Sequence, residues 1–238
     1  AALLYGADLS AIVPTCPAWT IADLVKHLGV TVRWAGTIVR TRATGFVPHD
    51  TVPDREVATD NGQMADWLRR GAVEFVKDLR EAGPDAVVWT GMPVADASFW
   101  ARRVTYETVI HRADAAHAVG AGDGYRVAAD VAEDAIDEWL FILASPWGKQ
   151  AAPRLSQLPG PASIALRATD ADANWLIEIG AGDFTWRRGV DEQASVTLRG
   201  PVSDVMQVFY RRLPVDSDAV EVLGDKNVLV DWLDRANF

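Results

Sequence analysis

The chain has 238 residues, enough for one large domain or two modest ones, and its 49% hydrophobic and 24% charged residues are typical of a protein with a folded core. Its net charge of −10 argues against nonspecific nucleic-acid binding, and no run approaches the roughly 18 uninterrupted apolar residues of a membrane span. A single cysteine, Cys16, excludes an internal disulfide and a thiolate-rich zinc site, and it fits a reducing cytoplasm.

The N-terminal stretch shows no secretion signal. Its first residues already belong to a hydrophobic pattern and no initiator Met precedes them, so we expect some N-terminal sequence to be missing. Residues 1–11 are predicted to be the tail of a helix, and two prolines three residues apart predict that residues 13–20 are extended. Thr20 is in position to cap the helix that follows, and Asp23 strengthens that start.

Four segments of the N-terminal part have helical hydrophobic periodicity. They are residues 21–42, 61–82, 102–120 and 128–144. Residues 43–60 are rich in Pro, Asp and Thr and are predicted to form a loop, with His49 at the surface. Four helices in succession predict an antiparallel bundle.

The composition changes after the fourth helix. Residues 146–161 contain four prolines and two glycines, the signature of a linker. Beyond them the hydrophobic period shortens toward two, which predicts short strands between Asp- and Gly-rich turns. The predicted strands are residues 162–168, 174–179, 184–188, 194–198 and 219–222, and the predicted helices are 202–212 and 226–237.

We therefore expect a chain of two domains. The first is an all-α four-helix bundle over residues 1–148. The second is a small α+β domain with an antiparallel sheet over residues 149–238.

The helix predicted over residues 102–120 carries a candidate site. Glu107 and His111 are four residues apart and lie one turn above the other on the same face. Because apolar or small residues dominate this face and the opposite one, the pair must be neutralised, ion-paired, bound to metal or open to a cavity. A carboxylate and an imidazole on adjacent turns form half of a helix-bundle metal site, although the spacing also suits a solvated pair or a simple hydrogen bond. His117 lies about 120° around the helix from His111 and is interpreted as structural.

His27 lies at the margin of the apolar stripe of residues 21–42, so we expect it to face a neighbouring helix. Taken alone, it is interpreted as a core-edge histidine bonded to a carbonyl. Its association with Glu107 and His111 depends on a resemblance to a known family.

Two segments of the chain resemble the signature motifs of the mycothiol-dependent maleylpyruvate isomerase family. The first is Val13-Pro-Thr-Cys-Pro-Ala-Trp-Thr followed by Asp23-Leu-Val-Lys-His27-Leu-Gly29, and the second is Tyr106-Glu-Thr-Val-Ile-His111-Arg-Ala-Asp114-Ala. The order of parts also matches, with a DinB-like bundle, a Pro-rich join and a small α+β domain. Ala18 departs from the family, which usually has Gly there.

The resemblance implies a divalent metal, usually zinc, held by His27, Glu107 and His111. Two imidazoles and one carboxylate leave at least one position open, which is the catalytic pattern for zinc. Nickel and cobalt would also accept this ligand set. Asp114 is either a support for one of the ligands or a solvent-facing acid at a helix end.

Members of the family use mycothiol, a low-molecular-weight thiol of actinobacteria, as cofactor. In the isomerase reaction the thiolate adds to the cis double bond of maleylpyruvate, the resulting single bond rotates, and elimination gives fumarylpyruvate. Because this substrate is a dianion, a cationic residue of the C-terminal domain should hold a carboxylate, and Arg212 is the nearest match, with Arg211 close behind. The alternative for either is a solvated arginine at a helix end. Cys16 is interpreted as a packing residue rather than a nucleophile.

Three functions are consistent with these residues. One is a metal-dependent enzyme that uses mycothiol for isomerisation or S-transfer on a small anionic or electrophilic substrate. Another is a non-catalytic metal- or ligand-binding protein of the same fold. The third is a stress-related bundle whose His and Glu side chains simply bond to each other.

Overall fold

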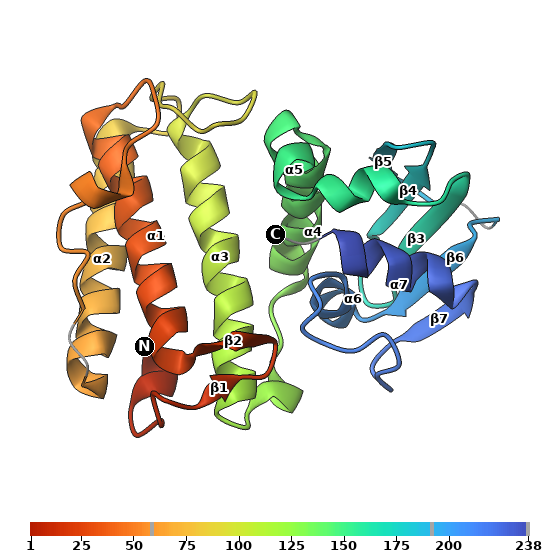
Figure 1. Ribbon diagram of the computed structural model, residues 1–238, viewed down its shortest axis with the longest axis horizontal. Helices are drawn as coiled ribbons and strands as arrows, with labels where there is room; N and C mark the ends of the chain where they lie inside the picture. The colour runs from red at the N-terminus through yellow and green to blue at the C-terminus, as the bar shows by residue number, and fades with distance from the viewer. Residues whose placement is uncertain (58–59, 191–192, 237–238) are drawn as a thin grey trace. The chain divides into compact units, whose positions relative to one another are not determined.

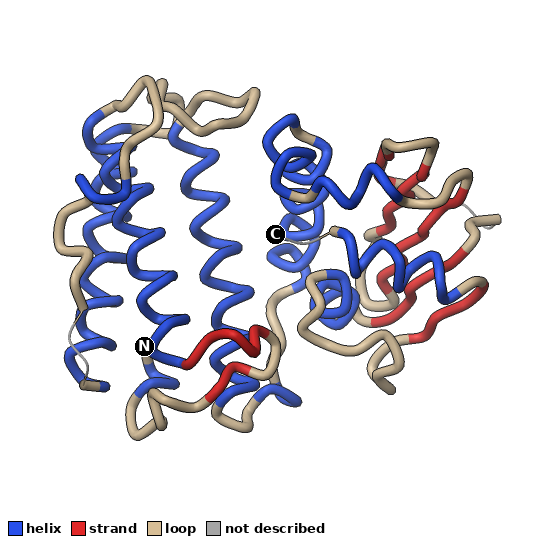
Figure 2. Tube along the Cα trace, viewed as in Figure 1, coloured by secondary structure: helices blue, strands red, loops and turns tan. Residues whose placement is uncertain are grey.

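The computed structural model describes residues 1–57, 60–190 and 193–236. The chain divides into two compact units, Ala1–Tyr125 and Arg126–Phe238. The first is built mainly of helices and the second of helices and a sheet, as Figures 1 and 2 show. The two-domain organisation, with helices first and a small α+β domain second, is as predicted.

The helix predicted as the fourth of the bundle groups with the second unit. This helix, α4 (Ala129–Ala144), packs on α6 (Val202–Phe209) and on β5 (Phe184–Arg188). The division by contacts therefore falls between residues 125 and 126, earlier than the boundary at 148 and 149 that the Pro-rich segment predicts.

The first unit opens with a short 3-10 helix, η1 (Ala2–Leu4), and not with the predicted helix tail over residues 1–11. Gly6 adopts a left-handed φ of 77°, and the Asp8 carboxylate accepts a hydrogen bond from the Ser10 amide, so the backbone turns instead of continuing a helix. The extended conformation predicted for residues 13–20 is confirmed. It contains a two-stranded antiparallel hairpin, β1 (Ile12–Val13) and β2 (Cys16–Thr20).

Three long helices follow. Figure 1 shows α1 (Ile21–Thr41) between α2 (Asn61–Ala82) and α3 (Ala97–Ala118). Thr20 and Asp23 cap α1 reciprocally, as predicted. Helix α3 begins earlier than expected, because the Asp96 side chain accepts from an amide of its first turn.

Two short 3-10 helices, η2 (His49–Thr51) and η3 (Gly122–Gly124), lie outside this three-helix core. His49 is exposed, as predicted, and its ring stacks on Trp34 with centroids 4.8 Å apart.

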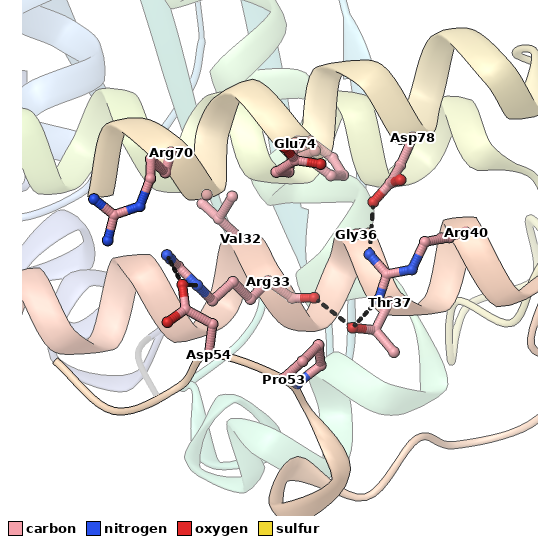
Figure 3. Close-up of a pocket in the computed structure, with 12 residues that line it drawn as sticks. Val32, Arg33, Gly36, Thr37, Arg40, Pro53, Asp54, Arg70, Glu74 and Asp78 are labelled. Atoms are coloured by element: carbon pink, nitrogen blue, oxygen red, sulfur yellow. Dashed lines mark hydrogen bonds and ion pairs between the residues drawn. The ribbon is translucent and has the colours of Figure 1, made fainter. Parts of the chain in front are cut away.

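A polar seam joins α1 to α2 around a cavity of about 200 Å³ (Figure 3). At one end Arg33 Nη2 donates to the carboxylate of Asp54 and to the carbonyl of Trp67, each at 2.8 Å. At the other end Arg40 Nη1 donates to Asp78 Oδ2 at 3.1 Å. The two buried charges, Arg33 and Asp78, thus each have an opposite partner, and the seam ties both helices to the loop that carries Asp54.

The segment 146–161 is not the linker without secondary structure that its prolines and glycines suggested. It contains helix α5 (Pro146–Ala151) and the 3-10 helix η4 (Pro153–Gln157). A proline occupies the first position of each, where its missing amide hydrogen costs nothing. Leu155 and Leu158 are buried, so the segment is part of the core of the second unit.

The second unit contains one five-stranded sheet with the strand order β5-β4-β3-β6-β7. Its strands are β3 (Ala162–Ala168), β4 (Asn174–Ile179), β5 (Phe184–Arg188), β6 (Val196–Gly200) and β7 (Glu221–Gly224). All neighbouring pairs are antiparallel except β3 and β6, which are parallel. The sheet is therefore small and mainly antiparallel, with one parallel pair that was not predicted.

Helices α6 and α7 (Lys226–Arg235) pack against β3 and β6. Trp232 of α7 is fully buried and stacks on Phe209 of α6. Helix α6 ends before Arg212, and residue 237, which was expected to close the last helix, lies outside the described residues. None of the described helices combines the length and the apolar character needed to cross a membrane.

Candidate metal centre

The structure brings His27, Glu107 and His111 together. Glu107 Oε2 lies 3.5 Å from His27 Nε2 and 3.2 Å from His111 Nε2. One ligand atom from each residue lies within 4.8 Å of the others, and in the described part of the chain this is the one cluster of His, Cys, Asp or Glu with that property. The sequence could relate Glu107 to His111 by helix periodicity, but the approach of His27 depends on the packing of α1 on α3.

The register of these two helices explains the approach. His27 contacts Glu107, and Trp34, seven residues later on α1, contacts Trp100, seven residues earlier on α3, with ring centroids 5.2 Å apart. Helices that meet in this order run antiparallel, and a step of seven residues is close to two turns on each. The packing of Trp34 on Trp100 therefore fixes the axial position at which His27 of α1 faces Glu107 of α3.

The hairpin before α1 supplies a ring beside the two imidazoles. The centroid of the Trp19 ring lies 4.8 Å from that of His27 and 6.0 Å from that of His111. The side chain of His27 is 37% exposed, whereas those of Glu107 and His111 are 19% and 11% exposed. The cluster is therefore reachable from solvent mainly on the His27 side.

Asp114 is fully buried and lies 2.8 Å from His111, Oδ2 to Nδ1. The alternative of a solvent-facing acid is therefore wrong. An ionised Asp114 accepts a hydrogen bond from Nδ1 of His111, which directs Nε2 toward Glu107, where it can carry either a proton or a metal ion. Burial disfavours the imidazolium, but hydrogen bonds to Asp114 and Glu107 outweigh it and raise the pKa of His111.

Two residues of the hairpin loop also contact Asp114. The hydroxyl of Thr15 donates to Oδ1 at 2.5 Å, and Cys16 Sγ lies 3.9 Å from Oδ2. Cys16 also packs against the apolar cluster at the base of α1 and α2, as its interpretation as a packing residue requires. Sequence patterns did not indicate the role of Thr15, because nearly a hundred residues separate it from Asp114.

Arg103 is a second residue that the sequence analysis missed. Its guanidinium contacts Glu107 Oε1 through both Nε and Nη2, and the Nε contact measures 3.1 Å. Burial favours the neutral acid, but Arg103 and the hydrogen bonds from His111 and His27 hold the pKa of Glu107 well below its ordinary range. The spacing of four residues between Arg103 and Glu107 was the available signal.

The donor atoms fit a divalent transition metal. Two imidazole nitrogens and one carboxylate oxygen are ligands that zinc, cobalt and nickel accept, and three protein ligands leave a position for another molecule. The support of His111 by a buried carboxylate on its other nitrogen is the usual arrangement behind a metal-binding histidine.

Arg212 lies in the second unit, in the turn after α6. Its Nη1 donates to the carbonyl of Tyr210 at 2.7 Å, and its neighbour Arg211 adopts a left-handed φ of 64°. The predicted helix over residues 202–212 is shorter than expected, so neither arginine is on it. A role of Arg212 in binding a substrate carboxylate stays a prediction.

Comparison with protein families identifies the chain. Residues 1–116 match the mycothiol maleylpyruvate isomerase N-terminal domain, and residues 130–230 match the C-terminal domain of the same proteins. The chain belongs to the mycothiol maleylpyruvate isomerase family. The resemblance carried by the two sequence motifs is therefore confirmed.

Solved structures of the mycothiol maleylpyruvate isomerase family include a similar fold. A histidine-to-alanine mutant of mycothiol-dependent maleylpyruvate isomerase aligns with 93% of this chain and 85% of its own, at 17% identity and a TM-score of 0.53. Two other solved structures match less well. A UbiJ-SCP2 ubiquinone synthesis protein is 18% identical and aligns with 44% of this chain and 84% of its own, at a TM-score of 0.32. The sec-alkylsulfatase Pisa1 from Pseudomonas sp. is 14% identical and aligns with 91% of this chain and 30% of its own, at a TM-score of 0.35. Curated protein sequences contain no match to the chain.

Proposed function

We propose that this member of the family is a metal- and mycothiol-dependent enzyme. It acts on a small electrophilic acid, either by thiol-assisted cis–trans isomerisation or by transfer of the thiol sulfur. His27, Glu107 and His111 would hold a divalent cation, and zinc is the first candidate. The observation that carries the proposal is the convergence of two Nε2 atoms on one oxygen of Glu107.

A bound cation of this kind supplies Lewis acidity, which lowers the pKa of a thiol so that it is a nucleophile at neutral pH. The chain's own residues prepare the place for it. Asp114 accepts a hydrogen bond from Nδ1 of His111 and so directs Nε2 toward Glu107, where a metal ion would replace the Nε2 proton, and Arg103 favours the ionised form of Glu107. The ring of Trp19 lies beside both imidazoles and adds an apolar surface next to the cluster.

The two reactions share a first step and differ in the second. In both, the thiolate sulfur forms a bond to an electrophilic carbon, and the electron pair of the double bond moves to the adjacent carbon. In isomerisation that pair returns after rotation, the carbon–sulfur bond breaks, and the thiol is regenerated. In S-transfer a proton is taken up and the carbon–sulfur bond remains. Arg212 is proposed to hold a substrate carboxylate in either case.

Metal content tests the proposed ligands. The protein should be purified without a nickel column and analysed for bound metal, next to His27→Ala and, as a matched control, His49→Ala. We expect about one equivalent of metal in the wild type and in the His49 variant, and almost none in the His27 variant, with cooperative unfolding retained in all three. Unchanged metal content in His27→Ala would refute the ligand assignment.

Turnover then tests the reaction. Metal-loaded protein is supplied with mycothiol and either maleylpyruvate or an electrophilic conjugation substrate. Formation of the trans isomer identifies an isomerase, and loss of free thiol with a stable adduct identifies an S-transferase. If metal is bound and neither product forms, the chain is a binding protein and the enzymatic part of the proposal is wrong.

A further inference from the structure

We propose that Arg103 is a positioning residue that restricts Glu107 to a single oxygen toward the cation and so keeps a coordination position open for the thiol. This inference rests on the proposed metal site. It concerns a residue that neither the family motifs nor the donor set includes.

The two oxygens of Glu107 have separate partners. Oε1 accepts from Nε and Nη2 of Arg103, whereas Oε2 faces His27 Nε2 at 3.5 Å and His111 Nε2 at 3.2 Å. Helix geometry produces this separation, because Arg103 lies one turn before Glu107 on α3 and His111 lies one turn after it. The carboxylate is held between a cation on one side and the ligand atoms on the other.

The contact is shielded enough to persist. The side chains of Arg103 and Glu107 are 15% and 19% exposed, so water competes weakly for the carboxylate. A charge-assisted contact through two nitrogens of a planar guanidinium also fixes the direction of the carboxylate, which a single ammonium donor would do less well.

The chemical consequence concerns the number of oxygens offered to the metal. A carboxylate without such a partner can bind a cation through both oxygens, which occupies a further position. With two imidazoles already present, a two-oxygen carboxylate would leave less room for a thiol. A guanidinium on Oε1 opposes that mode and favours the open, catalytic arrangement over a closed one.

Cobalt provides the test, because its visible spectrum reports the coordination number. The wild type, Arg103→Met and, as a control, Arg70→Met are loaded with Co²⁺, and cobalt content, visible absorption and the sulfur-to-cobalt band formed with 2-mercaptoethanol are measured. Arg70 is exposed and makes no hydrogen bond or ion pair with any described residue, so its variant controls for the loss of one positive charge.

We expect all three proteins to bind about one cobalt ion. In Arg103→Met the intensity of the visible bands should fall by about half, as coordination expands beyond four, and the thiol concentration needed for the sulfur band should rise about tenfold. The spectrum of Arg70→Met should equal that of the wild type. Arg103→Lys, which keeps the charge, should recover part of the wild-type intensity.

An Arg103→Met spectrum and thiol response equal to those of the wild type would overturn the inference and leave the metal site standing. If Arg103→Met fails to fold, Arg103→Gln repeats the measurement with a polar side chain in place of the apolar one, and the same criterion applies. Absence of stoichiometric cobalt in the wild type would instead refute the proposed metal function, and with it this inference.

Discussion

Asp114 joins the hairpin loop to the candidate metal centre through its two oxygens. Oδ2 contacts Nδ1 of His111 at 2.8 Å, and Oδ1 accepts from the hydroxyl of Thr15 at 2.5 Å. A carboxylate this deeply buried needs such partners, because an uncompensated charge in the interior is very costly. The loop of β1 and β2 is thereby tied to the face of α3 that carries His111.

The role of Asp114 predicts the effect of Asp114→Asn. The asparagine amide can present a donor where the carboxylate accepts, which favours the wrong tautomer of His111. We expect zinc affinity to fall by about 10- to 100-fold, measured by competition with a chromophoric chelator. Asp85→Asn, an exposed acid of the same unit, is the control. Equal zinc affinities in both variants would show that Asp114 does not support the ligand.

Thr15 is predicted to act through Asp114. Thr15→Val keeps the shape of the side chain and removes the hydroxyl, which leaves Oδ1 of Asp114 without that donor. We expect a loss of about 1–3 kcal/mol in the free energy of unfolding of the metal-free protein, measured by urea titration, together with weaker zinc binding. Thr15→Ser retains the donor and should recover most of both quantities. A serine variant as impaired as the valine variant would assign the effect to packing of the methyl group.

Gly29 is predicted to be required for the close contact of α1 with α2. A Cβ at this position would lie 1.9 Å from the ring of Trp67, which is itself buried and donates to the carbonyl of Asp54. Gly29→Ala should therefore destabilise the protein by about 1–3 kcal/mol, even though alanine favours helices. Gly45→Ala, where the new atom would meet open space, should change stability by less than about 0.5 kcal/mol. Chemical denaturation of both variants checks the difference, and equal stabilities would contradict it.

The buried carboxyl group of Asp78 is predicted to make the free energy of unfolding depend on pH. Burial raises the pKa of Asp78 above its ordinary value of 3.8, and Arg40 opposes this only in part. The folded state therefore binds the proton more tightly than the unfolded state does, so stability falls as pH rises from about the unfolded value through the raised folded value. The Asp78→Asn variant has no ionisable group at this position, so its stability does not fall for this reason as the pH rises. The free energy of unfolding of the wild type relative to this variant should decrease across that interval and then level off. A difference that stays constant or increases with pH would contradict the prediction.

Several features of the fold were predictable because their causes are local. Thr20 and Asp23 form the expected capping box within one turn, and the two prolines hold residues 13–20 extended. The prediction of a linker over residues 146–161 was wrong. Proline usually interrupts a helix, but it is favourable at the first position, which Pro146 and Pro153 occupy in α5 and η4. Composition does not distinguish these two cases.

The sequence alone determined that Glu107 and His111 share one face of a helix, since the period of 3.6 residues is a property of the backbone and needs no tertiary contact. Only the tertiary structure decided that His27, eighty residues away, meets them, that Asp114 is buried behind His111, and that Arg103 occupies the other oxygen of Glu107. These contacts depend on the register of α1 against α3, which rings such as Trp34 and Trp100 set by packing. Packing of that kind depends on the shapes of many side chains at once, so no spacing along the chain encodes it.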